Sequence, residues 1–206
     1  KIQPNSAAGY YYLAKLGEIK LNLKDEQMVK LVRFYYQQAL KIAPDNTAVR
    51  LEYARFLVVS NKVDQAIKEI DQILKLEPSN LQARNFLAEI FLHKNNFKGA
   101  ISAFEEAKKY EKDTIDTDIK IAIIQFQTGM IEDAEKKLKE LVLKSPGNPK
   151  INYYLASILA SNNQIDQSLQ YINNIRSTDD LFVESRFLAV YFLKIEKRYT
   201  DSQNKI

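Results

Sequence analysis

The sequence contains no cysteine, no tryptophan and a single histidine, His93. Without cysteine the chain forms neither disulfides nor thiolate metal sites, and one histidine excludes a metal site built from several histidines. Five glycines and five prolines are few for 206 residues. Because a β-rich fold needs many tight turns, this scarcity favours helices joined by short connections. We therefore expect an all-α chain that holds no metal and no cofactor.

Long hydrophobic segments are also missing. No apolar run approaches the roughly 18–20 residues that span a bilayer, and the first residues, Lys1-Ile2-Gln3-Pro4, lack the apolar stretch of a signal peptide. These absences leave the compartment open between cytoplasm and periplasm. A composition rich in lysine, isoleucine and asparagine favours a bacterial origin.

The charge balance is slightly positive, with 30 Lys and Arg against 26 Asp and Glu, giving a net charge of +4. The two signs are nevertheless mixed along predicted helices, as in IEDAEKKLKE at 131–140. This mixture is typical of a solvated helix face with i,i+4 ion pairs. We therefore expect no nucleic-acid binding, which would instead show a strong dependence on salt.

The residues that could support catalysis are sparse. Carboxylate pairs at 105–106 and 132–133 lie beside lysines at exposed helical positions, whereas acid–base catalysis needs a desolvated pocket. We interpret His93 as a surface or groove histidine. No glycine-rich phosphate loop is present, because three of the glycines stand alone at Gly99, Gly129 and Gly147. The sequence predicts a protein that is not an enzyme.

Several residue columns recur every 34 residues, which indicates an internal repeat. Prolines stand at Pro44, Pro78 and Pro146, and Lys112 occupies the place of the missing one. Small residues form two columns: Ala54, Ala88, Ala122 and Ala156, then Ala66, Ala100, Ala134, Ser168 and Ser202. Large apolar residues form a third, at Val63, Phe97, Ile131, Ile165 and Tyr199.

Each unit reads as a helical hairpin. Within 47–80 the apolar residues follow a helical period on both sides of the polar break Ser60-Asn61-Lys62. Similar breaks occur at 94–96, 128–130 and 161–164. We predict two helices of about 14 residues, each about 20 Å long, with the small residues at the closest approach of their axes.

These columns resemble the tetratricopeptide repeat (TPR), and the resemblance covers essentially the whole chain. It implies a right-handed superhelical solenoid of stacked antiparallel helical hairpins. We predict one TPR array over 1–206, in which 1–6 end a preceding repeat and a partial repeat closes the chain. The repeats are expected at about 7–46, 47–80, 81–114, 115–148, 149–181 and, in part, 182–206.

The sequence departs from the family pattern in four places. Tyr10 stands where the family often has tryptophan, and Val32 replaces the small residue of its helix. The first repeat is about six residues longer, with the extra length expected within 20–27, and the register slips by about one residue between 177 and 187. We interpret EKRYTDSQ, 196–203, as a hairpin turn and the start of a second helix.

Pro4 matches the proline column, so we expect the chain to be a segment of a longer array. Terminal repeats of a solenoid need a polar cap, and neither end has an evident one. We therefore expect exposed apolar ends that promote self-association.

In the resembling family, the first helices build a concave groove that binds extended peptides or short helices. Carried over by repeat position, the groove residues here are Tyr11, Lys15, Leu51, Arg55, Asn85, Glu89, Ile119, Ile123, Tyr153 and Ser157, with Val59, His93, Gln127 and Lys150 at further groove positions. Lys15, Arg55 and Glu89 are expected to select the register of a peptide. The lysine and asparagine pattern of the family's chaperone-tail receptors is missing from these columns.

The leading hypothesis is a non-enzymatic protein–protein interaction scaffold that binds a protein segment, a peptide or helix, in the concave groove. The alternative is a structural or oligomerisation module that supports other domains of a longer chain. Nucleic-acid binding by lysine-rich outer helices is a third hypothesis.

Overall fold

The computed structural model describes residues 6–20 and 22–203, and this part of the chain is helical without strands. The all-α prediction is confirmed. None of the described helices is long and apolar enough to cross a membrane. The helices are α1 (Ala7–Ile19), α2 (Glu26–Ile42), α3 (Thr47–Val59), α4 (Val63–Leu76), α5 (Leu81–His93), α6 (Phe97–Lys108), α7 (Ile115–Gln127), α8 (Ile131–Lys144), α9 (Pro149–Ser161), α10 (Ile165–Asn173) and α11 (Phe182–Gln203).

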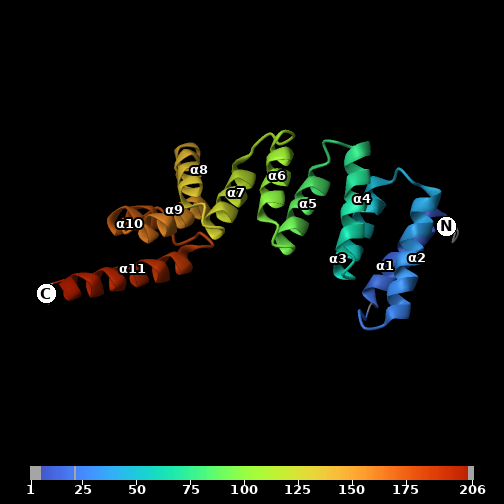
Figure 1. Ribbon diagram of the computed structural model, residues 1–206, viewed down its shortest axis with the longest axis horizontal. Helices are drawn as coiled ribbons and strands as arrows, with labels where there is room; N and C mark the ends of the chain where they lie inside the picture. The colour runs from blue at the N-terminus through green and yellow to red at the C-terminus, as the bar shows by residue number, and fades with distance from the viewer. Residues whose placement is uncertain (1–5, 21, 204–206) are drawn as a thin grey trace. The chain divides into compact units, whose positions relative to one another are not determined.

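The chain divides into two compact units, Lys1–Glu111 and Lys112–Ile206, which we call the N-unit and the C-unit. The N-unit contains the hairpins α1–α2, α3–α4 and α5–α6 (Figure 1). The C-unit contains the hairpins α7–α8 and α9–α10 followed by α11. Of residues 1–6, which the sequence suggested to be the end of a preceding repeat, 1–5 lie outside the described residues. Ser6 caps α1, where its side chain accepts a hydrogen bond from Gly9 N at 3.0 Å.

The turns inside the four hairpins from α3 to α10 have the same backbone conformation. Asn61, Asn95 and Asn163 have φ of 59°, 55° and 59°, and Gly129 has φ of 81°. These residues are 34 apart, and asparagine and glycine are the residues that best tolerate the left-handed region. In each turn the following backbone N–H donates to the carbonyl five residues earlier, as Lys62 does to Leu57 at 2.7 Å. This arrangement, the Schellman motif, ends the first helix.

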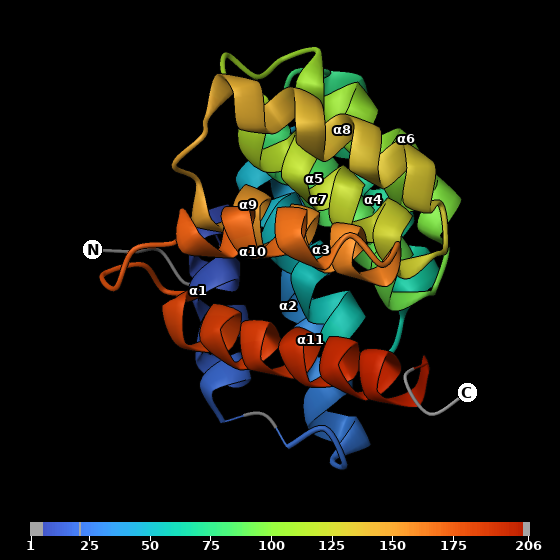
Figure 2. The same ribbon diagram turned by 90° about the vertical axis from the view of Figure 1, so that its left-hand side faces the viewer.

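One predicted turn is not formed. The segment 196–203 continues α11 as helix, so the interpretation of EKRYTDSQ as a turn followed by a new helix was wrong. The residue 34 positions after Asn163 is Lys197, which favours helix and does not favour positive φ. In Figure 2, α11 runs beside α9 and α10. It packs through Phe192, Leu188 and Ala189 onto Ala156 and Ile172.

Consecutive hairpins are joined by a recurring side-chain contact. The proline carbonyl of one repeat accepts a hydrogen bond from a side chain six residues later: Arg50 to Pro44 at 2.6 Å, Arg84 to Pro78 at 2.8 Å and Asn152 to Pro146 at 2.7 Å. We call this contact the proline hook. The three connections that carry it each have four residues, at 43–46, 77–80 and 145–148.

The connection before α7 lacks the chemistry of the proline hook. Lys112 occupies the proline position, and Asp118 occupies the donor position. An ionised carboxylate can only accept hydrogen bonds, and Asp118 accepts from Thr114 Oγ1 at 2.9 Å and from Lys137 Nζ at 3.3 Å. The connection is longer, at 109–114, and the boundary between the two units falls within it.

The small residues lie at the centre of the hairpins. Ala54, Ala66, Ala88 and Ala100 are fully buried, as are Ala122, Ala134, Ala156 and Ser168. A small side chain lets two helix backbones approach closely. The packing prediction from the alanine columns agrees with this burial.

The first hairpin solves the same packing problem differently. Val32, in the small-residue column, is fully buried, and it faces Gly17 on α1. A Cβ atom added to Gly17 would lie 2.5 Å from Val32 Cγ2. In the second hairpin, Leu57 and Ala66 occupy the positions that correspond to Gly17 and Val32. In the first hairpin the small residue is therefore on the first helix and the larger one on the second, whereas the second hairpin has the reverse arrangement.

Candidate peptide-binding surfaces

The first helices of the N-unit are joined by a chain of charged side chains. Lys15 Nζ on α1 lies 2.7 Å from Glu18 and 2.8 Å from Glu52 on α3. Arg55 Nε lies 3.8 Å from the same Glu52, and its guanidinium stacks over the Phe86 ring of α5 at 4.6 Å. Lys15 and Arg55 thus have partners within the protein already, which reduces the charge they offer to a peptide.

Burial alone would lower the pKa of Lys15, but hydrogen bonds with Glu18 and Glu52 outweigh this effect and raise the pKa above its ordinary value. Lys15 therefore stays charged at neutral pH. The contact between Lys15 and Glu18 follows from their spacing on one helix. The contact with Glu52 links different helices, and the sequence analysis did not identify it.

Tyrosines of the first two hairpins divide between core and surface. Tyr36 is fully buried, stacks on Tyr53 with ring centroids 5.3 Å apart, and donates its hydroxyl proton to Glu18 Oε1 at 2.6 Å. Burial, followed by this hydrogen bond, raises the pKa of Tyr36 well above its ordinary value. Tyr12, by contrast, is about half exposed.

The residues assigned to the groove by sequence differ in accessibility. In the N-unit, Leu51 is buried in the core, while Arg55 and Glu89 are exposed and the others are half-buried: Tyr11, Lys15 and Asn85. The buried Oδ1 of Asn85 has no hydrogen-bond partner in the described structure. His93 is exposed at the end of α5.

In the C-unit, the first helices α7 and α9 border a cavity of about 390 Å³. Ile119 and Ile123, both predicted groove residues, contribute to its apolar lining. Ile119 is nearly fully buried, whereas Ile123 is half-buried. The complete lining is Asp116, Ile119, Lys120, Ile123, Lys150, Tyr154 and Leu181. The cavity therefore combines an apolar surface with charges of both signs.

A second cavity, of about 370 Å³, lies between α9 and α11. Tyr153, a predicted groove residue, lines it together with Glu184, Phe187, Leu188 and Tyr191. The rings of Tyr153 and Tyr154 are perpendicular, with centroids 5.4 Å apart, so adjacent tyrosines of α9 line the two cavities. Ser157, the remaining predicted residue, donates its hydroxyl to the Tyr153 carbonyl at 2.9 Å.

Sequence reasoning missed the contribution of α11 to this surface. Phe187 and Tyr191 are 73% and 59% exposed, and their i,i+4 spacing on one helix face was visible in the sequence. Among the described residues, no group of three or more His, Cys, Asp or Glu is placed to hold a metal ion.

Part of the sequence is similar to a known protein family. Residues 32–90 match the family model described as tetratricopeptide repeat. Tetratricopeptide repeat protein 21A of Mus musculus is 22% identical over 144 residues, covering 68% of this chain and 11% of that protein. A putative cytochrome c-type biogenesis protein CcmH of Haemophilus influenzae is 32% identical over 88 residues, covering 41% of this chain and 18% of that protein. The chain spans 11% to 34% of the length of the curated relatives it matches.

Solved structures share the fold. Yeast Tom70 superposes with a TM-score of 0.65 at 18% identity, over 94% of this chain and 41% of that one. YrrB, described as a TPR protein with an unusual peptide-binding site, gives a TM-score of 0.58 at 16% identity, over 79% of this chain and 84% of that one. The chain contains tetratricopeptide repeats and has an all-α, TPR-like fold. In general, the TPR fold supports a role as a protein–protein interaction scaffold.

Proposed function

We propose that the chain is a non-enzymatic scaffold that binds a peptide or short helix against the first helices, with α7 and α9 of the C-unit as the principal contact. The observation that supports this proposal is the cavity of about 390 Å³ beside Ile119, Ile123 and Tyr154. Its volume is within the ordinary range for a binding pocket. Aromatic side chains next to a cavity are frequent anchors for partners.

The charges around this cavity support a peptide with apolar anchors and polar flanks. Asp116 and Lys150 are exposed and border the cavity with opposite signs. In the N-unit, Lys15 and Arg55 are instead paired with Glu18 and Glu52. Breaking those pairs would cost part of the binding energy that a peptide could gain there. The C-unit is therefore the better candidate surface.

A phage-displayed library of random linear peptides, selected on the whole chain, tests this proposal. We expect enriched peptides to lose binding by about tenfold, or about 1.4 kcal/mol, in Lys150→Glu and in Tyr154→Ala, because both residues line the cavity. Lys136→Glu, an equal charge change at an exposed position on the second helix α8, is the matched control. Peptides that bind all these variants equally would contradict the proposed surface.

A structural role is the second candidate, and exposed apolar side chains favour it. Leu13 and Leu16 on α1 and Leu31 and Phe34 on α2 are 37% to 57% exposed, although they belong to a hairpin. Apolar patches of this kind often mediate association. Light scattering over a wide concentration range should show self-association that Leu31→Lys with Phe34→Lys suppresses. A wild-type chain that stays monomeric throughout would contradict this role.

A further inference from the structure

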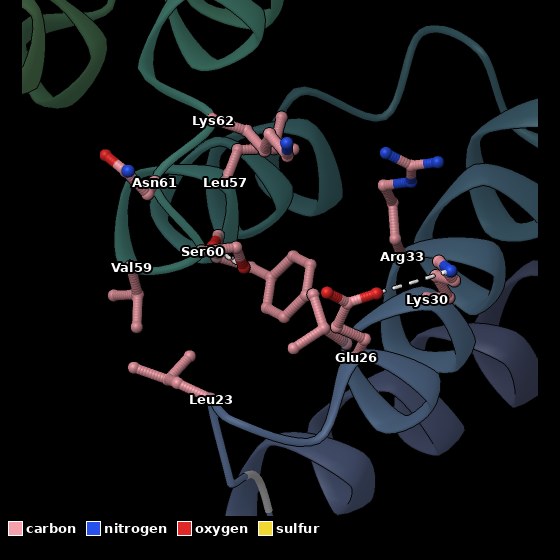
Figure 3. A pocket seen from close by; sticks show the side chains of 11 residues that line it. Leu23, Glu26, Lys30, Arg33, Leu57, Val59, Ser60, Asn61 and Lys62 are labelled. Atoms are coloured by element: carbon pink, nitrogen blue, oxygen red, sulfur yellow. Dashed lines mark hydrogen bonds and ion pairs between the residues drawn. The ribbon is translucent and has the colours of Figure 1, made fainter.

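A cavity of about 500 Å³ lies in the N-unit at the turn ends of the first two hairpins (Figure 3). It is formed by the connection after α1, the first turns of α2, the end of α3 and the turn before α4. None of its lining residues belongs to α7 or α9. It is therefore separate from the surface proposed above. We call it the turn-end cavity.

The long first connection accounts for this cavity. Six residues, 20–25, join α1 to α2, whereas three join the helices in the next hairpins, at 60–62, 94–96 and 128–130. The extra residues carry Leu23 to the cavity. The sequence analysis located the additional length but assigned it no role.

The lining combines apolar and basic groups. Phe56 and Leu57 are buried in its wall, and Leu23 and Val59 remain 52% and 58% exposed at its edge. Val59 had been assigned to the concave groove by its repeat position. In Figure 3, Leu23 and Val59 lie at one side of the cavity, and the guanidinium of Arg33 lies at the other.

The basic groups of the turn-end cavity are not neutralised by the protein. Glu26 forms an ion pair with Lys30 at 3.7 Å, so these two charges offset each other. Arg33 and Lys62 also line the cavity, and neither forms an ion pair within the described part of the chain. The site therefore has a net positive charge beside exposed apolar side chains.

We propose that the turn-end cavity binds an acidic peptide segment in which a large apolar side chain adjoins a carboxylate. The apolar side chain would lie against the half-buried Val29, between Leu23 and Val59. The carboxylate would accept hydrogen bonds from the guanidinium of Arg33, whose planar donors match a carboxylate in geometry. Lys62 would attract a second acidic residue. This is a second binding site, independent of the surface on α7 and α9.

The same phage-displayed peptide library tests this inference, using the whole chain. We expect a class of peptides with leucine or phenylalanine next to aspartate or glutamate. Their affinity should fall about tenfold or more in Arg33→Gln and in Val59→Ser. Lys41→Gln and Ile42→Ser are matched controls, because both residues are exposed on α2 and neither lines the cavity.

The variants separate the two proposals. Peptides of the turn-end cavity should bind Lys150→Glu and Tyr154→Ala as well as the wild type, and peptides of the C-unit should bind Arg33→Gln unchanged. If no enriched peptide depends on Arg33 and Val59, or if the dependent peptides are basic, the inference is wrong. Far-ultraviolet circular dichroism of each variant verifies that loss of binding is not loss of folding.

Discussion

Gly17 and Val32 show how two residues compensate for each other within one hairpin. The sequence identified Val32 as a departure from the small-residue column but did not identify Gly17 as its partner. The pairing follows only when the two helices are placed against each other, because the residues are 15 apart along the chain and separated by a six-residue connection. A glycine in a helix interior costs about 1 kcal/mol relative to alanine, so close packing against Val32 explains its presence.

Gly17→Leu should destabilise the protein by about 1–3 kcal/mol through overpacking against Val32. Gly17→Leu combined with Val32→Ala recreates the arrangement of Leu57 and Ala66, and should recover most of this loss. Chemical denaturation of the two single variants and the double variant measures the coupling. Additive effects would show that the two side chains do not share one site.

Tyr36 gives the stability a dependence on alkaline pH. An ordinary tyrosine ionises near pH 10, whereas burial and the hydrogen bond to Glu18 raise the pKa of folded Tyr36. The unfolded chain therefore loses this proton first. The contribution of Tyr36 to stability is fully present below about pH 10 and declines as the pH rises above it.

Unfolding free energies measured between about pH 8 and pH 11 test this dependence. We expect Tyr36→Phe to show a smaller decline above pH 10 than the wild type. Tyr12→Phe, which removes the hydroxyl of a tyrosine that is 51% exposed, should decline as the wild type does. Equal slopes for Tyr36→Phe and the wild type would exclude the proposed role of the Tyr36 hydroxyl.

The roles of the charged groove residues could be predicted only in part. Repeat position alone placed Lys15 and Arg55 on first helices, where they are found. Their pairing with Glu52 and Phe86 depends on contacts between helices and on side-chain rotamers, which periodicity does not specify. For the same reason, the sequence did not reveal that Leu51 is buried.

At the scale of helices and turns, most of the structure could be predicted from the residues that recur every 34 positions. The polar breaks located the turns, but the requirement for positive φ at Asn61, Asn95, Gly129 and Asn163 went unrecognised. Had it been recognised, Lys197 would have indicated that α11 continues through 196–198. The reason is steric, because the side chain of lysine disfavours positive φ, which glycine and asparagine tolerate.

Adjacent asparagines in the turn after α9 allow a matched test. Asn163 has φ of 59° and Asn162 has φ of −90°, and both are exposed. Asn163→Val should cost about 1–2 kcal/mol because a β-branched residue is strained at positive φ, whereas Asn162→Val should cost less. Thermal or chemical unfolding of the two variants compares them, and a larger loss for Asn162→Val would refute the assignment.

On the scale of the whole molecule, the connection 109–114 separates the N-unit from the C-unit. It lacks the proline hook that holds the other three connections between hairpins. Limited trypsin digestion should therefore cut first after Lys109 or Lys112, which are both exposed, and should leave fragments that match the two units. Initial cleavage after Lys41, Lys75 or Lys144, which lie next to hooked connections, would contradict this expectation.

The proline hook also constrains how such a chain can change length. In each case the donor stands six residues after the proline, and one inserted residue would rotate the donor by about 100° and shift it by about 1.5 Å along the helix. Insertions and deletions between hooked hairpins should therefore be rejected during evolution. No proline hook fixes the length of the turns within hairpins. The connection between α1 and α2 is accordingly longer, with six residues at 20–25 instead of three.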